Sequence, residues 1–183
     1  MADADAGRPC DSEPDPESVA RAVCLRLLSA APRSRAQLAE ALRRRGVPDP
    51  AAEAVLDRLT EVGLVDDAAL ATAWVQSRHR GRGLARRALA TELRQRGVEA
   101  ETVATAVATL DVDDEVQMAR NLVARRLPAT AGLPNQVRAR RLAGLLARKG
   151  YPGAMAGRVV REALAAAGQD REGTDEAAGC DED

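Results

Sequence analysis

A short phrase that occurs three times constrains this chain more than any other feature of its sequence. Each copy ends on a glycine, at Gly46, Gly97 and Gly150, and successive glycines are 51 and 53 residues apart. Leucine stands eight and four residues before each glycine, alanine stands seven before, and an arginine or lysine stands immediately before. Such a period is that of a supersecondary unit rather than of a single helix, so the sequence predicts a repeat protein.

The residues around each glycine have the pattern of three helices. In the first copy, Val19, Val23 and Leu27 follow one another at helical spacing. Pro at position 32 ends that helix, Ser34 is the expected N-cap of the second, and Gly46 is its expected left-handed C-cap. The third helix is expected to turn four apolar residues inward: Val55, Leu56, Leu59 and Val62.

These patterns predict an all-α fold of three tandem three-helix repeats that form an elongated, curved array. The chain contains almost no aromatic residues, so a single repeat buries too little apolar surface to be stable alone and should pack on its neighbours. The predicted repeats are residues 17–65, 66–112 and 113–167, and the acidic segments 1–16 and 168–183 are predicted to be disordered tails.

The net charge of −1 hides a segregation of charge along the chain. Residues 17–167 contain 25 basic and 16 acidic side chains, whereas both tails are strongly acidic. A basic body favours a polyanionic partner, because neutralising phosphates releases counterions. The sequence contains neither a long apolar run nor a signal peptide, which predicts a cytoplasmic protein without a membrane segment.

No catalytic constellation is recognised in the sequence. His79 is the only histidine and stands between Arg78 and Arg80, close to the point where Gly81 and Gly83 are expected to break the helix. This position predicts an exposed basic loop rather than a buried general base. The segment has neither a Walker motif nor a dinucleotide-binding fingerprint. We therefore predict a protein that is not an enzyme and uses no cofactor.

The aspartate pairs of the chain are interpreted as helix caps rather than as metal ligands. Asp66 or Asp67 is expected to cap one helix and Asp113 or Asp114 another, while Asp49 caps the helix after the first glycine. A hard cation would need several more converging oxygens, so no metal site is predicted. The cysteines have no metal-ligand spacing either, and the middle one, at position 24, is expected in the core.

Two aromatic side chains are expected to pack rather than to bind. Trp74 is four residues after Leu70, on the apolar side of its predicted helix, and Tyr151 takes the position of Val47 and Val98 in the repeat. The aromatic residues are not interleaved with basic ones in the way that single-strand readout requires.

The arginines are the candidate functional residues. Seven arginines and one acid, Glu92, lie between Arg78 and Arg96. Exposed helix faces normally carry charges of both signs, whereas this segment carries almost only positive ones. The candidate contact residues are Arg78, Arg80, Arg82, Arg86, Arg87, Arg94, Arg43, Arg44, Arg138, Arg140 and Arg141.

The middle repeat resembles the RecX family of bacterial proteins that modulate the RecA recombinase. The resemblance is carried by G-L-V-D-D-x-x-L-A-x-x-W-V at Gly63–Val75 and by L-A-x-x-L-x-x-R-G-V at Leu89–Val98, with weaker copies of the second phrase on both sides. It covers the chain from about Val19 to Leu164, outside the acidic tails.

The resemblance implies a protein without catalytic activity that binds along the groove of the RecA filament on single-stranded DNA, and we predict that it does so as a monomer. It would bridge protomers there and reduce ATPase and strand-exchange activity, with or without direct contact to the DNA. Two alternatives stay open: a helix-turn-helix transcription regulator that uses one repeat in the major groove, and a helical adaptor that binds no nucleic acid.

Overall fold

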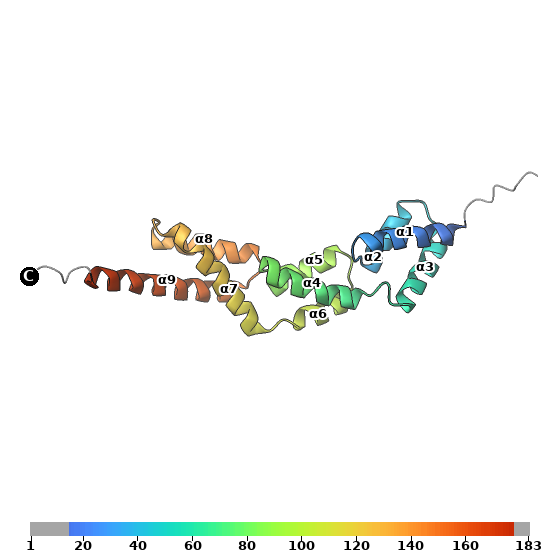
Figure 1. Cartoon of the computed structure of the whole chain (residues 1–183). Coiled ribbons are helices and arrows are strands. Elements are labelled where there is room, and N and C mark those ends of the chain that lie inside the picture. Colours follow the sequence, from blue (N-terminus) through green and yellow to red (C-terminus); the bar gives the residue numbers. More distant parts are fainter. Residues whose placement is uncertain (1–14, 178–183) are drawn as a thin grey trace, which may run out of the picture. The chain divides into compact units, whose positions relative to one another are not determined.

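The computed structural model describes residues 15–177, with side chains as far as Gly168. The described residues form nine α-helices and one short 3₁₀ helix, and they contain no strand (Figure 1). The chain divides into two compact units between Leu70 and Ala71. The all-α fold of three tandem three-helix repeats is confirmed, while the elongated, curved form of the array stays a prediction.

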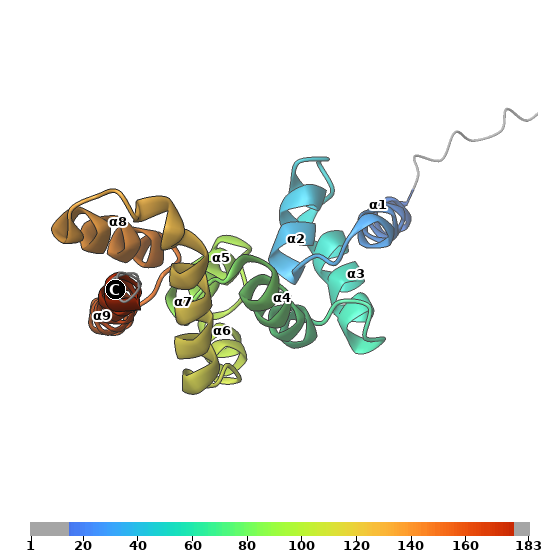
Figure 2. The same cartoon turned by 60° about the vertical axis from the view of Figure 1, so that its left-hand side comes forward.

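The first unit contains the first repeat. Its helices are α1 (Pro16–Ala30), α2 (Arg35–Arg43) and α3 (Asp49–Glu61), which lie beside one another (Figure 2). Their buried side chains form one core. Ser34 caps α2 as predicted, because its hydroxyl accepts the Gln37 N–H while the Gln37 side chain accepts the Ser34 N–H. The side chain of Cys24 is fully buried in this core, as the sequence predicts.

The second unit contains the other two repeats. The bounds of its helices are α4 (Asp67–Arg82, beginning before the division), α5 (Arg86–Gln95), α6 (Ala100–Ala108), α7 (Val112–Arg126), η1 (Pro128–Thr130), α8 (Asn135–Arg148) and α9 (Gly153–Ala177). One core lies among α4, α5 and α6, and a second lies among α7, α8 and α9.

The repeated phrase forms the same structure in all three repeats. The leucines eight and four residues before each glycine are 0 % exposed: Leu38, Leu42, Leu89, Leu93, Leu142 and Leu146. Each glycine has a positive φ, between 73° and 88°. The residue after each glycine is buried and donates its backbone N–H to the carbonyl of the second leucine. This is the Schellman geometry, in which a left-handed residue lets the chain close the helix.

Within the second unit, the second and third repeats are joined by backbone contacts. Gly150 lies so close to the first turn of α5 that a Cβ added to it would stand 2.6 Å from the Ala88 nitrogen. The Ala85 N–H donates to the Lys149 carbonyl (2.9 Å), and the Tyr151 hydroxyl donates to the Gly83 carbonyl (3.2 Å). Ala85 is itself part of the α7–α9 core. The two repeats therefore share one packed interface.

The prediction that His79 lies in an exposed loop is wrong. Helix α4 continues through Gly81 and ends only before Gly83, so His79 lies in its last turns and is 5 % exposed. Its Nδ1 is 2.9 Å from the Leu84 carbonyl. Because a carbonyl oxygen only accepts hydrogen bonds, the Nδ1 of His79 carries the proton and donates to it. His79 is thereby bonded to the turn that precedes α5.

Several predicted caps and boundaries are shifted. Asp66 caps α4 by accepting the Ala69 N–H at 2.8 Å, as predicted, but α7 is capped by Asp111 rather than by Asp113 or Asp114. Helix α3 begins one residue earlier than predicted, with Pro48 at the N-cap. Asp113 and Asp114 instead lie in the first turn of α7, where their charges favour the helix dipole.

The ends of the array also differ from the predicted bounds. Val62, expected in the core, is 54 % exposed because α3 ends at Glu61 and the chain turns at Gly63. Helix α1 begins at Pro16, and α9 continues to Ala177, past the predicted end of the third repeat, since extending an existing alanine-rich helix costs little. The remaining residues of the two predicted tails, 1–14 and 178–183, lie outside the described residues.

Candidate functional site

Glu92 on α5 organises the basic residues at the end of α4. Its carboxylate accepts the Trp74 Nε1–H at 2.9 Å and lies 3.5 Å from the Arg82 guanidinium and 3.9 Å from that of Arg78. The Trp74 ring is half-buried against the α4–α6 core. Arg78 and Arg96 place their guanidinium carbons 4.1 and 3.6 Å from its centroid. Trp74 packs as predicted, and it also holds two cations by cation–π contact.

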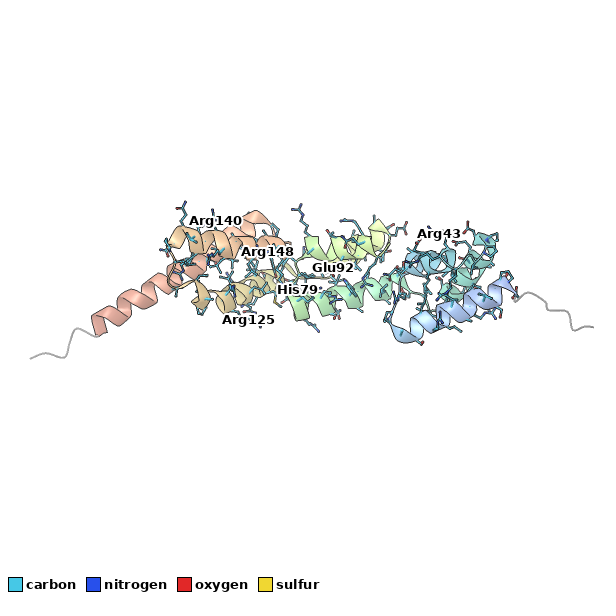
Figure 3. All side chains as sticks on the ribbon, turned by 90° about the horizontal axis from the view of Figure 1, so that it is seen from above. Arg43, His79, Glu92, Arg125, Arg140 and Arg148 are labelled. Carbon is cyan, nitrogen blue, oxygen red and sulfur yellow. The ribbon has the colours of Figure 1, made fainter. Side chains whose placement is uncertain are left out.

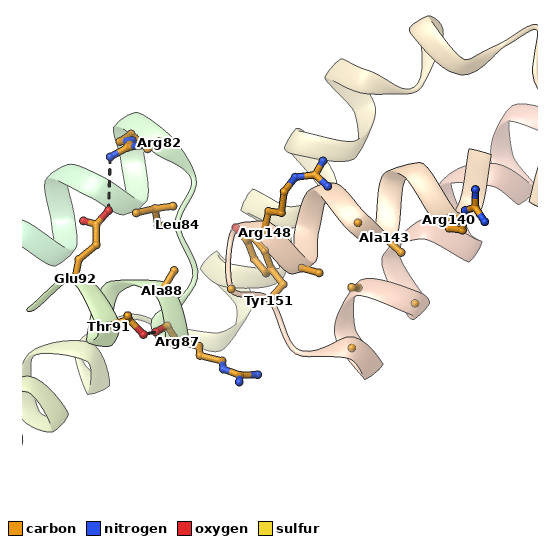
Figure 4. Close-up of a pocket in the computed structure, with 16 residues that line it drawn as sticks. Arg82, Leu84, Arg87, Ala88, Thr91, Glu92, Arg140, Ala143, Arg148 and Tyr151 are labelled. Atoms are coloured by element: carbon orange, nitrogen blue, oxygen red, sulfur yellow. Dashed lines mark hydrogen bonds and ion pairs between the residues drawn. The ribbon is translucent and has the colours of Figure 1, made fainter. Parts of the chain in front are cut away.

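A groove of about 1040 Å³ runs between the second and third repeats (Figure 4). Arg82 and Arg87 come from the α4–α5 side, and Arg140 and Arg148 come from α8. Among the described residues, Glu92 is the only acidic one that lines it. The floor is made mostly of small residues: Ala88, Ala143, Gly144, Ala147, Gly150, Gly153, Ala156 and Gly157. The groove is therefore basic at its walls and apolar at its floor.

A second hollow, of about 470 Å³, lies on the other side of the same row of α8 residues. Arg140, Gly144 and Arg148 line both spaces and follow one another at intervals of four residues, on one face of the helix. Arg126 and Arg141 also line the second hollow, and no acidic side chain of the described part of the chain lines it. The face of α8 between the two hollows is thus strongly basic.

Most of the arginines predicted as contact residues lie on the surface. Arg80, Arg87, Arg94, Arg140 and Arg141 are exposed and make no ion pair in the part of the chain that the structure describes; Arg140 projects away from α8 (Figure 3). Arg82 is exposed but pairs with Glu92. In the first unit, Arg43 and Arg44 are exposed and pair with Glu40 of their own helix. Arg78 is half-buried against Trp74.

Two predicted contact residues have structural roles instead. Arg138 is 4 % exposed and donates to Thr130 Oγ1 and to Asn135 Oδ1 (3.2 Å). The guanidinium of Arg86 donates to the Leu110 carbonyl and lies 3.5 Å from the buried Glu115 carboxylate. Because these cations are used within the fold, we remove both from the set of surface contacts.

The backbone hydrogen bond that Arg86 donates has a counterpart at Arg35 in the first repeat. Arg35 and Arg86 both stand eleven residues before their glycines. The backbone N–H of Arg35 donates to the Asp67 carboxylate and that of Arg86 to the Glu115 carboxylate, each at 2.9 Å. In both cases the acid lies in the first turn of the next repeat's first helix, α4 or α7. It accepts a backbone N–H at the start of the preceding repeat's second helix, α2 or α5, that has no partner within that helix.

Tyr151 lies beneath the groove and is unsuited to proton transfer. Burial raises the pKa of its phenol well above the usual value, and the nearby Glu115 carboxylate adds to the rise. The phenol therefore stays neutral and keeps its hydrogen bond to the Gly83 carbonyl.

Sequence reasoning missed Arg148 as a groove residue and did not include Arg126 in the contact set. The available signal was the eight-residue spacing of Arg140 and Arg148, which puts them on one helix face. Neighbouring Arg125 is exposed and lines neither hollow.

Two other kinds of site are absent from the described residues. No group of three or more histidine, cysteine, aspartate or glutamate side chains is arranged there to hold a metal ion. Nor does that part of the chain contain a helix with the length and apolarity needed to cross a membrane.

Comparison with known proteins identifies every repeat. Residues 20–59, 66–107 and 113–160 match the models of the first, second and third three-helix domains of RecX. The regulatory protein RecX of Streptomyces coelicolor is 61% identical over 158 residues, which are 86% of this chain and 84% of that protein. The RecX of Thermobifida fusca is 64% identical over 149 residues, 81% of this chain and 80% of that protein.

Solved structures agree in fold. The crystal structure of RecX from Lactobacillus salivarius superposes with a TM-score of 0.75 at 16% sequence identity and covers 81% of this chain and 96% of that one. A second crystal structure of regulatory protein RecX has a TM-score of 0.69 at 20% identity, over 77% of this chain and 70% of that one.

Proposed function

Because this chain belongs to the RecX family of regulatory proteins, whose members act on the RecA recombinase, we propose that it binds along the groove of the RecA filament on single-stranded DNA. Binding there lowers the ATPase and strand-exchange activities of the filament. The observation that carries this proposal is the family match, which extends over all three repeats.

The charges of the second unit support a filament as the partner. Arg80, Arg87, Arg94 and Arg140 are exposed and make no ion pair with the described residues. A guanidinium group suits carboxylates and phosphates alike because its planar fork donates two parallel hydrogen bonds. Both chemical groups are present on a protein filament that encloses DNA.

The interface between the second and third repeats supports the bridging of protomers. Ala85 and Lys149 are joined by a backbone hydrogen bond, and Gly150 is in contact with Ala88. The arginines of α5 and α8 are therefore held on one packed body. A body with two basic surfaces at a constant separation is suited to contact a periodic partner at two points, and it would oppose the changes in protomer spacing that accompany turnover.

We propose further that the protein acts as a monomer in the cytoplasm, without catalytic activity or a cofactor. The basic surface described above and the regulatory role of the family support this interpretation. The proposal leaves room for direct contact with the DNA.

The proposal is tested by titrating the protein into a RecA ATPase assay on single-stranded DNA, with filament co-sedimentation measured in parallel. We expect inhibition at amounts comparable to RecA and co-sedimentation of the protein with the filament. Unchanged ATPase together with no co-sedimentation at low salt would refute it.

A pair of matched variants connects the inhibition to the second unit. Arg80→Glu combined with Arg87→Glu should weaken inhibition by about tenfold or more, since two attractive contacts become repulsive. The control, Arg21→Glu combined with Arg26→Glu, makes the same charge change at two exposed positions of α1. Equal losses for both pairs would point to net charge rather than to this surface.

A further inference from the structure

The groove between α5 and α8 has walls and a floor of different chemistry, and the difference suggests its occupant. We propose that the groove docks an amphipathic helix of the partner protein, with small apolar residues on its inner face and carboxylates along both edges. The inference rests on the proposed function, since the filament is the partner that would supply the helix, and it names a protein segment rather than DNA as the ligand of this groove.

The floor allows a helix to approach closely. Ala143 and Ala147 on α8, and Gly153 and Gly157 on α9, are spaced by four residues and lie in the lining together with Ala88 of α5. Rows of small residues four apart form shallow channels that receive the side-chain ridge of another helix. With so little side chain on the floor, the axis of a docked helix can come near those of α8 and α9.

Two glycines on the floor have no internal reason to be glycine. Gly144 and Gly157 lie inside helices, where glycine is less stable than alanine. A Cβ on Gly144 would meet only the Nη1 of Arg148, at 3.4 Å, and a Cβ on Gly157 only the Nη1 of Arg161, at 3.5 Å. Both contacts are ordinary and are made by the tips of flexible side chains. The packing of the described residues would accept alanine there, so the space is free for a ligand.

The walls carry charge that the fold does not use. Arg87, Arg140 and Arg148 make no ion pair within the described residues, and Glu92 already holds Arg82 (Figure 4). Helix α9 begins at Gly153 on the floor, and the N-terminal end of a helix adds positive potential. Cations on both sides of an apolar channel are complementary to a helix with acidic residues along its two edges.

A nucleic-acid strand fits the same groove less well. The hydroxyl groups of Thr91 and Tyr151 already donate to the carbonyls of Arg87 and Gly83, so these two lining side chains offer no free donor to a phosphate. Tyr151 is also 4 % exposed and presents no open ring face on which a base could stack. Single strands are usually held by aromatic platforms combined with cations, and only the cations are found here.

The test is a photo-crosslink from the rim of the groove. A photoreactive benzophenylalanine is placed at Thr91, which lines the groove, and as control at Thr105, which is exposed on α6 outside both hollows. Each variant is bound to RecA filaments on single-stranded DNA, irradiated and analysed by mass spectrometry, while co-sedimentation of the unmodified protein is measured separately.

We expect the Thr91 variant to form an adduct with a helical RecA segment that contains acidic residues, and the Thr105 variant to form none at that segment. An adduct with DNA, an adduct with another copy of this chain, or the lack of an adduct while the protein co-sediments would each overturn the helix proposal and leave the proposed function standing. Failure of the unmodified protein to co-sediment would reject both.

A second pair of variants tests the closeness of the approach. Ala147→Leu fills the floor, whereas Ala124→Leu makes the same change at an exposed alanine of α7 outside the groove. Filament affinity should fall about tenfold for the first and less than about twofold for the second, with unchanged thermal unfolding in both. Equal affinities for the two variants would contradict a helix seated on this floor.

Discussion

Gly150 and Ala88 are in contact through their backbones, at a distance that leaves no space for a side chain on the glycine. A Cβ at position 150 would lie 2.6 Å from the Ala88 nitrogen and 2.7 Å from its Cβ. Gly150 therefore has two functions in one residue: it closes α8 with a φ of 88°, and it allows the third repeat to pack against the second.

This contact predicts different costs for the same substitution at two glycines. Gly150→Ala should lower the free energy of unfolding by about 3 kcal/mol, because it combines left-handed strain with a backbone clash. Gly46→Ala should cost only about 1 kcal/mol, because φ is 73° there but nothing lies within 4 Å. Urea unfolding of both variants measures the difference, and equal costs would contradict the steric role of Ala88.

Glu115 is expected to stabilise the second unit more than its counterpart Asp67 stabilises the first. Glu115 is 4 % exposed and bonds both the backbone and the side chain of Arg86, whereas Asp67 is half-buried and accepts the Arg35 N–H. Glu115→Ala should cost about 2 kcal/mol and Asp67→Ala about 1 kcal/mol. Thermal unfolding tests the order of the two values, which a reversed result would disprove.

Tyr151 should titrate only in strongly alkaline solution. Burial raises its pKa, so the folded state holds the phenolic proton more tightly than the unfolded state does. The resulting stabilisation is fully present below the unfolded pKa of about 10 and declines as the pH rises above it.

Tyr151 is the only tyrosine in the chain, so the phenolate absorbance reports on it alone. Folded protein should show no phenolate at pH values near 10, and the change should appear together with unfolding at higher pH. Tyr151→Phe should remove this part of the alkaline destabilisation. A phenolate signal near its usual pKa in protein that is still folded would argue against the buried position.

Removing the charge of Glu92 should strengthen binding to an acidic partner. Glu92→Gln keeps an acceptor for the Trp74 Nε1–H but leaves the groove without an acidic residue. Filament affinity should rise by about two- to fivefold at low salt, and the gain should disappear at high salt through screening. Glu101→Gln, an exposed site on α6, is the control. Weaker binding by Glu92→Gln would mean that the acid itself contacts the partner.

Arg138 and Arg140 are two positions apart in the sequence and should respond differently to substitution. Arg138→Gln should cost about 1 to 2 kcal/mol of stability, because it loses buried hydrogen bonds to Thr130 and Asn135. Arg140→Gln should change stability by less than about 0.5 kcal/mol and reduce filament binding, since its side chain is exposed at the groove. Unfolding and co-sedimentation of both variants decide the assignment.

Sequence reasoning succeeded where the structure depends on neighbours along the chain. The first leucine of each repeated phrase is fully buried, at Leu38, Leu89 and Leu142, and the repeat glycines have positive φ. Both features are indicated by the repeated phrase itself. Helical spacing and capping are local properties, so a single phrase carries them. The exposed arginines of α5 could be recognised for the same reason, since Arg87 and Arg94 lie opposite Leu89 and Leu93.

The errors fall on residues whose contacts are made by another element of the fold rather than by their own helix. His79, Arg86 and Arg138 read as basic surface residues, yet the turn before α5, the start of α7 and the η1 segment bury or bond them. The groove itself has one wall from α5 and the other from α8, and its floor includes α9. The spacing of residues within one repeat does not indicate that Arg87 of α5 and Arg140 and Arg148 of α8 line the same groove.

The amino-acid sequence alone therefore specified the helices, the threefold repeat, the glycine turns and the family, because each depends on short-range periodicity and on phrases that can be compared directly. The structural role of Arg86 and the groove with its glycine floor followed only from the packing of the third repeat on the second, whereas the burial of His79 and Arg138 followed from contacts between elements within their own repeats. The contact of Gly150 with Ala88 brings together residues of α5 and α8, and long-range contacts of this kind leave no periodic signal in the chain.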